Sequence, residues 1–337
     1  MLKRTLTLSL IFLLSLTGRV QAQTNVATTI GQFLQIEPSS RIGAMGNAGS
    51  AIRNEPMAAY FNPAAVGSAT MAGVQMTHSS WLADISYDYA IANIPFGNGS
   101  GMMVNVTSLR SGDIAVRTVD LPLGTGEYYS VNDLAFGVGY GMMLTDRVSA
   151  GLQVTYMQEN IWHSNLSTFS INFGTQYQLT DDGITLGASL SNFGTRNRFT
   201  GRDLRIRYDA NKDIYGDNSS LPAEYFTEEY GLPVMFRVGI AAPLKLADGH
   251  EFLFVADATH PNNNTESVNI GGEYTFSQMF SLRMGYQNLF ETDAIVGLTA
   301  GAGVLIELSG IDMRFDYAWT EYGVLDGVQR MTVAFSF

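Results

Sequence analysis

The chain has 337 residues, of which 46% are hydrophobic and 15% are charged, with 35 glycines, no cysteine and a formal net charge of -12. The lack of cysteine excludes disulfides, thiolate metal sites and a lipid-anchored cysteine, and the negative charge argues against nucleic-acid binding, which needs a basic surface. Soluble domains carry about 25% charged residues, yet no segment beyond the N-terminus approaches about 18 consecutive apolar residues, which argues against membrane-spanning helices.

The N-terminus has the layout of a secretory signal peptide. Lys3 and Arg4 precede the apolar residues 6–16, and a small-residue cleavage site ends at Ala22. We predict that residues 1–22 are removed on export. An uncleaved N-terminal anchor is the alternative, but the apolar stretch is shorter than the roughly 20 residues that a membrane span needs.

Residues 23–70 lack the alternation of membrane strands, and we predict that they form a plug, or hatch, inside a barrel mouth. Three glycines at a spacing of three permit close backbone approach or positive φ; they are Gly43, Gly46 and Gly49. Pro63 keeps Asn62 out of the helical region. A phosphate-binding loop is disfavoured because neither a strand nor a Gly-Lys-Ser/Thr sequence accompanies the glycines.

Beyond residue 70, apolar and polar residues alternate. In residues 311–320 the apolar Ile311, Met313 and Phe315 are offset by charged residues, and a period of two predicts strands with two different faces. A soluble sandwich would also alternate. Here, however, the apolar faces are large and unbroken, and they carry Tyr or Trp near an end, as the aromatic girdles of membrane barrels do.

We predict fourteen strands, and therefore an all-β fold: a transmembrane antiparallel β-barrel over residues 71–337 in the outer membrane of a Gram-negative bacterium. The strands are expected at 71–79, 84–95, 100–110, 131–144, 148–160, 165–179, 184–194, 233–244, 250–260, 266–276, 280–288, 295–308, 311–321 and 328–337. An even number places both barrel ends on the periplasmic side. The long connections 111–130 and 195–232 then fall on the outside.

The last strand ends on aromatic residues, Phe335 and Phe337. Outer-membrane proteins commonly end in this way. We therefore expect these residues to act as an assembly signal for the barrel-assembly machinery, with outer-membrane lipid as the other constant partner.

The polar faces of the last strands carry charges that we expect in the lumen. They are Arg283, Asp312, Arg314, Asp316 and Arg330, with Glu273 and Glu307 as candidate partners. We interpret them as a structural ion-pair network, because buried charges are normally paired. The alternative is a polar lumen that holds the plug or guides a ligand.

The loop 195–232 mixes arginines, acidic residues and aromatics. Loops longer than about 15 residues are usually functional or disordered, and the aromatic content argues against disorder. A surface for a protein partner and a folded lid are both open interpretations. Asp209, Asn211 and Asp213 resemble the start of a calcium loop, but the glycine expected at the sixth position is Ile214.

We expect no catalytic site, no metal and no cofactor. The four histidines, at positions 78, 163, 250 and 260, lack metal-ligand spacing. His163 adjoins Ser164, but adjacent residues of a strand point to opposite faces, which argues against a Ser–His pair.

The stretch from Ser40 through Ala65 resembles the N-terminal signature of the PorV/PorQ family of Bacteroidota-type bacteria, within the FadL-like outer-membrane superfamily. The matching residues are Arg41, Gly43, Met45, Gly46, Ala48, Gly49, Asn62, Pro63 and Ala64. Shorter matches follow around Trp81, Asn192, Asp203 and Arg237, so that the resemblance covers most of residues 40–242.

This resemblance implies a 14-stranded barrel with an N-terminal plug, and it points to two functions. PorV-like and PorQ-like proteins take part in type IX secretion, where they handle cargo proteins that carry a C-terminal secretion signal. FadL-like proteins are passive channels for hydrophobic small molecules. We expect the secretion role, with secretion components or cargo proteins as partners. The alternatives are a channel with a hydrophobic ligand and a structural barrel with no transport.

Overall fold

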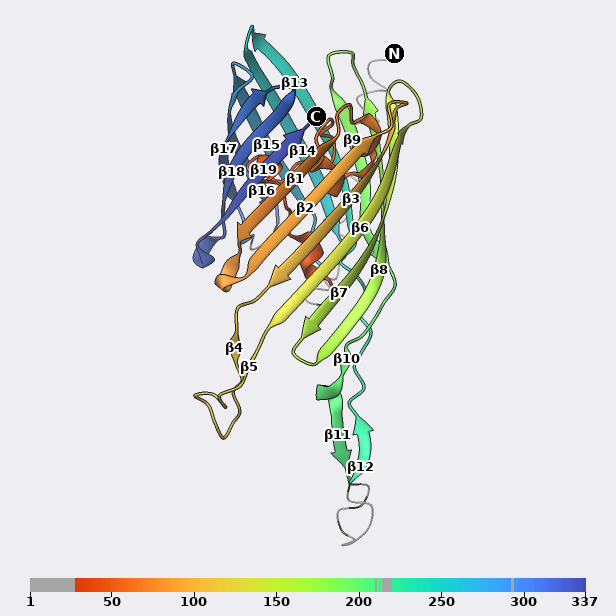
Figure 1. The fold of residues 1–337 in the computed structure, drawn as a ribbon, viewed down its shortest axis with the longest axis vertical. Coiled ribbons are helices and arrows are strands. Elements are labelled where there is room, and N and C mark those ends of the chain that lie inside the picture. The colour runs from red at the N-terminus through yellow and green to blue at the C-terminus, as the bar shows by residue number, and fades with distance from the viewer. Residues whose placement is uncertain (1–27, 210, 212, 214–219, 292–293) are drawn as a thin grey trace, which may run out of the picture.

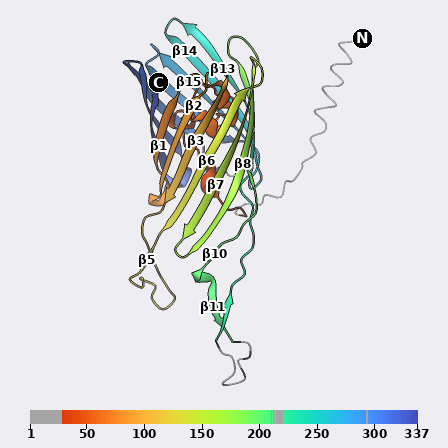
Figure 2. The same cartoon turned by 45° about the vertical axis from the view of Figure 1, so that its right-hand side comes forward.

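The computed structural model describes residues 28–337 except 210, 212, 214–219 and 292–293. Fourteen antiparallel strands close into a barrel (Figure 1, Figure 2). Consecutive barrel strands pair, and the first, β1, pairs with the last, β19. The predicted signal peptide, residues 1–22, lies outside the described residues, as does part of the calcium-like run.

The barrel strands are β1 (Gly73–Ser80), β2 (Ser86–Pro95), β3 (Ser100–Arg110), β6 (Val131–Met143), β7 (Val148–Ile161), β8 (Ser164–Gln178), β9 (Thr185–Gly194), β13 (Met235–Ala247), β14 (His250–Pro261), β15 (Ser267–Phe276), β16 (Phe280–Leu289), β17 (Leu298–Leu308), β18 (Ile311–Glu321) and β19 (Gly327–Ser336). The predicted 14-stranded barrel is confirmed. Strand β13 ends three residues beyond its predicted end, because its ladder with β14 continues through a bulge between Lys245 and Ala247.

The connections differ in length at the two ends of the barrel. At one end, here called the turn end, the strands are joined by short turns, and β1 begins beside the end of β19. The other end, the loop end, carries both long connections, as the strand count predicted. Figure 1 shows them extending from the barrel. They hold β4 (Ile114–Ala115), β5 (Tyr128–Tyr129), β10 (Thr200–Gly201), η4 (Arg202–Leu204), β11 (Arg205–Tyr208) and β12 (Leu221–Glu224).

The two faces of the wall have opposite chemistry. Side chains that point into the barrel are mostly polar and buried, as are Gln75, Asn105 and Gln153. Side chains that point outward are apolar and exposed, as are Phe169 and Met284. A soluble protein buries its apolar face instead. This inside-out arrangement is what a lipid-facing barrel requires.

Within the barrel, residues 28–70 form short helices joined by tight turns. These are η1 (Gln32–Gln35), α2 (Ser40–Gly43), α3 (Ala58–Phe61) and η2 (Pro63–Ser68), and two more, η3 (Leu82–Asp84) and η5 (Gly323–Leu325), lie at the loop end. The side chains of Ser39 and Asn62 cap α2 and η2. In the described part of the chain, no helix is long and apolar enough to cross a membrane.

Candidate functional site

Residues 28–70, here called the plug, run through the lumen from the loop end to the turn end (red to orange in Figure 1). At the loop end, the amide of Ile30 donates to the carbonyl of Gly231 at 3.0 Å. At the turn end, Nη1 of Arg53 donates to Oε1 of Gln178 at 2.6 Å. The plug therefore contacts the wall over the length of the barrel.

Glycines in the wall let the plug backbone approach closely. A Cβ on Gly271, Gly285 or Gly301, which lie on β15, β16 and β17, would meet plug atoms of residues 44–46. Gly46 itself has φ of 71°, and a Cβ there would lie 2.5 Å from the carbonyl oxygen of Ile270. Larger residues would push the plug away from this wall.

A second glycine row receives the Asn-Pro-Ala motif. Gly141, Gly151 and Gly174 are paired side by side across β6, β7 and β8, and a Cβ on any of them would meet plug atoms between residues 62 and 67. The side-chain nitrogen Nδ2 of Asn62 donates to the backbone carbonyls of Ser50 at 2.8 Å and Thr175 at 2.9 Å. This side chain thus ties the plug to itself and to the wall.

Six charged side chains form a closed ring of ion pairs between plug and wall. In order around the ring they are Arg41, Glu55, Arg314, Asp316, Arg283 and Glu273. Positive and negative groups alternate at N–O distances of 2.5 to 2.7 Å, so that the ring is neutral. Two members belong to the plug and four to β15, β16 and β18.

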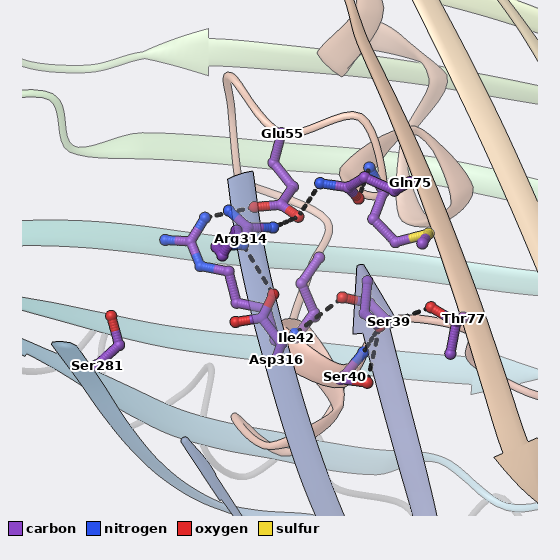
Figure 3. Close-up of polar contacts among 12 residues, drawn as sticks. Ser39, Ser40, Ile42, Glu55, Gln75, Thr77, Ser281, Arg314 and Asp316 are labelled. Carbon is purple, nitrogen blue, oxygen red and sulfur yellow. Dashed lines mark hydrogen bonds and ion pairs between the residues drawn. The ribbon is translucent and has the colours of Figure 1, made fainter. Parts of the chain in front are cut away.

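Glu55 is the plug's carboxylate in this ring. Figure 3 shows it directed from its loop towards Arg314, and Gln75 on β1 also donates to its Oε1 at 3.0 Å. Burial raises the pKa of Glu55, but the positive charges of Arg314 and Arg41 outweigh this effect and lower the pKa to about 2. The group is therefore charged at neutral pH. Its ion pair with Arg314 joins the plug to the wall, while its pair with Arg41 lies within the plug.

The structure brings together part of the predicted set of lumen charges. Arg283, Arg314 and Asp316 lie in the ring, as does Glu273, which the sequence offered as a partner. Asp312 and Glu307 form no ion pair among the described residues. Sequence reasoning missed Glu55. The sequence did offer one indication, because Glu55 is the one acidic residue between residues 38 and 70 and was therefore the candidate partner in the plug for the arginines of the wall.

Arg330 lies apart from the ring and is fully buried. Its Nη1 donates to Oγ1 of Thr320 at 2.8 Å, and its Cζ lies 5.6 Å from the ring centroid of Trp81. Its Nε and Nη2 have no hydrogen-bond partner among the described residues. The predicted assembly residues lie elsewhere, on the outer face: Phe337 is exposed, and its amide donates to the carbonyl of Ala72.

The cavities inside the barrel are lined mostly by residues with polar side chains. A cavity of about 460 Å³ at the loop end is lined by residues that include Glu37, Arg237 and Asn269. One of about 620 Å³ at the turn end includes Arg53 and Glu251. Between them lies a space of about 30 Å³, which is enough for a water molecule.

A more apolar groove of about 740 Å³ lies on the outer wall. It is lined by residues of β14 to β17 such as Phe254, Leu282 and Met284. Leu282 and Met284 point away from the lumen, since Arg283 between them points into it. This groove therefore faces the lipid rather than the lumen.

The two long connections form arms that project from the loop end. The short arm (residues 111–130) exposes Val119 by 98% and Leu123 by 96%. The long arm (residues 195–234) exposes Phe226 by 82%, with the guanidinium of Arg198 4.6 Å from its ring centroid. Large apolar side chains held at such exposure are typical of a surface that meets a partner.

A cluster of three or more His, Asp or Glu residues suited to a metal ion is absent from the described part of the chain. His163 does contact Asp203, through Nδ1 and Oδ1 at 2.9 Å, at the base of the long arm. Arg202 approaches the same imidazole. This contact ties the arm to the end of β7 and β8.

A comparison with protein families gives one match. The sequence model of the family described as "Type IX secretion system protein PorV" matches residues 19–194, which is 176 of the 337 residues. A search of curated proteins returned no match.

Two solved structures with a similar fold are described as toluene transporters. The toluene transporter TodX of Pseudomonas putida is 11% identical, with a TM-score of 0.56 over 88% of this chain and 96% of that chain. The toluene transporter TbuX of Ralstonia pickettii is 13% identical, with a TM-score of 0.54 over 90% of this chain and 98% of that chain. At this identity the likeness shows the fold alone.

Proposed function

We propose that this chain, which belongs to the PorV family of type IX secretion system proteins, handles cargo proteins in type IX secretion at the cell surface. The chain is an outer-membrane β-barrel. The loop end of such a barrel faces the outside. Protein partners would therefore meet the two arms first.

The exposed apolar side chains of the arms are the observation that carries this proposal. The exposed side chains are Val119 and Leu123 on the short arm, and Tyr225 and Phe226 on the long arm. Exposed clusters of this kind mark interaction sites, and aromatic residues are enriched in protein interfaces. A lipid surface does not explain them, because the arms extend beyond the barrel wall (Figure 2).

The interior of the barrel also favours the secretion role over a channel for hydrophobic molecules. A channel for hydrophobic small molecules would need an apolar path, because burying an unpaired polar group against an apolar ligand costs free energy. The cavities at both ends instead carry charged, amide and hydroxyl side chains beside a few apolar ones such as Ile52 and Leu253. The ion-pair ring lies at the turn-end cavity through Arg41. A chain that only passed hydrophobic molecules would gain nothing from this lining.

The hydrophobic channel is the second candidate. The shared fold with TodX and TbuX favours it, and the groove on the outer wall near Met284 offers an apolar surface. On this hypothesis, a ligand would reach the lipid through the wall, and the plug would have to move.

An affinity capture separates the two. The tagged protein is extracted in detergent from its native membrane, and bound proteins and lipids are identified by mass spectrometry. The secretion role predicts enrichment of secreted proteins that share a C-terminal domain. A Val119→Ser/Leu123→Ser variant should lose most of that enrichment, because these side chains contribute to the surface and little to the fold.

The matched control is Leu246→Ser/Leu308→Ser, which removes two exposed leucines at the turn end and should leave protein capture unchanged. Heat-modifiable migration in gels checks that each barrel is folded. Recovery of a fatty-acid-like or aromatic ligand without a stoichiometric protein partner would reverse the order of the two candidates.

A further inference from the structure

The loop-end cavity carries two opposite charges that the fold leaves unpaired. Arg237 on β13 and Glu37 of the plug both line it, with the amides of Gln35, Asn269 and Asn288 around them. Neither charged group takes part in an ion pair among the described residues, which is unusual for buried charges.

Arg237 is buried to 4% exposure, and its Nη1 donates to Oγ of Ser191 at 3.2 Å. The guanidinium otherwise lies near the rings of Tyr60 and Phe61, at 6.0 and 5.8 Å from their centroids. A guanidinium has five N–H donors in a planar fork. Several donors therefore remain for another acceptor in the cavity.

The acidic groups nearby do not take up this capacity. Asp257, on the strand that pairs with β13, accepts from the amide and hydroxyl of Ser50 at 2.9 and 2.8 Å. Glu37 accepts no hydrogen bond from another side chain among the described residues. Burial raises the pKa of Glu37, although the positive charges of Arg330 and Arg237 oppose this effect. The other carboxylate of the lining, Glu291, accepts from the side-chain nitrogen of Asn264 at 2.6 Å. Arg237 is therefore the positive group of this lining, and it still has N–H donors to offer a ligand.

The side-chain amides that line the cavity also have unused hydrogen-bond donors. Oδ1 of Asn269 accepts from the backbone amide of Asn288 at 2.8 Å, which leaves the side-chain nitrogen of Asn269 free to donate. Donors of this kind suit a ligand rich in oxygen atoms. They do not suit a hydrocarbon, which would leave them unsatisfied.

We propose that the loop-end cavity binds a small hydrophilic carboxylate that enters from outside: Arg237 holds the ligand's carboxylate, and Glu37 accepts from its hydroxyl or ammonium groups. The cavity volume of about 460 Å³ lies within the usual range for ligand sites. This site is separate from the arms and does not depend on the proposed role in secretion.

The test measures binding to the full-length, detergent-purified protein by titration calorimetry. Two probes share a carboxylate and differ in their other groups: glucuronate carries hydroxyls, and glycylglycine carries an ammonium group. Glucose serves as the probe without a carboxylate. We expect saturable binding of at least one carboxylate probe and none of glucose. The probe that binds distinguishes a sugar acid from a peptide-like ligand.

Arg237→Gln should weaken binding of that probe at least tenfold. Asn269→Asp should weaken it similarly while leaving Arg237 in place, because it adds a negative charge to the cavity and keeps the acceptor for Asn288. This second variant covers the case in which Arg237→Gln does not fold. Arg205→Gln, an equal change of charge on the exposed β11, should bind as the parent does.

Saturable binding of glucose with the same affinity as glucuronate would overturn the proposal. So would binding of neither carboxylate probe, or unchanged affinity in both cavity variants. If the parent protein binds a carboxylate probe but captures no cargo proteins, the result counts against the secretion role alone.

Discussion

Replacing Glu55 by Gln removes one charge from the six-membered ring and should loosen the plug. Gln keeps the size of the side chain, but both ion pairs of Glu55, with Arg41 and Arg314, are lost. The buried ring then carries one uncompensated positive charge. We expect the plug to open far more often, while the strands of the barrel remain paired.

The size of the effect follows from the pKa of Glu55. The pKa falls from the ordinary 4.5 to about 2, and each pKa unit corresponds to about 1.4 kcal/mol. The charged form therefore stabilises the docked plug by at most about 3 kcal/mol relative to the neutral form, because Arg41, which contributes to the shift, belongs to the plug itself. This agrees with the roughly 3–5 kcal/mol that breaking a buried ion pair costs. It corresponds to an increase on the order of a hundredfold in the open population.

The chain contains no cysteine, so a single introduced thiol reports plug opening without background. Ala48→Cys places it at a buried plug position. A maleimide reagent then labels the thiol at a rate that follows the open population, when opening and closing are fast. Labelling in the Glu55→Gln background should be faster on the order of a hundredfold.

Two further variants make this reasoning refutable. Glu55→Gln/Arg314→Gln removes one charge of each sign and leaves the ring neutral, so part of the protection should return. Glu127→Gln makes the same change at an exposed site and should leave labelling unchanged. If Glu55→Gln labels no faster than Glu127→Gln, the ring does not hold the plug.

Three further predictions concern acid, packing and assembly. Because the pKa of Glu55 lies below its ordinary value, its contribution to the stability of the docked plug is complete above pH 4.5 and is lost as the pH falls through about 2. Pepsin should therefore cut the plug increasingly as the pH falls through this window. Cleavage of the Glu55→Gln variant should vary less with pH. Gly151→Val should displace the plug at Pro63 and cost about 1–3 kcal/mol, measured as faster thiol labelling, whereas Gly112→Val, which has open space around it, should not. Deleting Phe337 should reduce the amount of folded barrel in outer-membrane fractions; an unchanged yield would count against its role as an assembly signal.

The strands could be predicted from the sequence because alternation is a local property. Apolar and polar residues alternate along the sequence of residues 311–320 whatever the chain's conformation. In a membrane strand, the apolar residues face lipid and the polar residues face the lumen, so this alternation predicts the strand. The count of fourteen then placed both long connections at one end. The sequence also indicated that Arg283, Arg314 and Asp316 share the lumen with the plug.

Only the tertiary structure decided which of these groups meet. Asp316 joins the ring and Asp312, four residues away on the same strand, does not, because only the former lies at the level of Arg283 on the wall. Glu55 and Arg314 are 259 residues apart, so no local pattern links them. The same holds for the row of Gly141, Gly151 and Gly174, which exists because strand register aligns them. Periodicity depends on the backbone of one strand, whereas ion pairs and close packing depend on how separate strands and the plug are placed against one another.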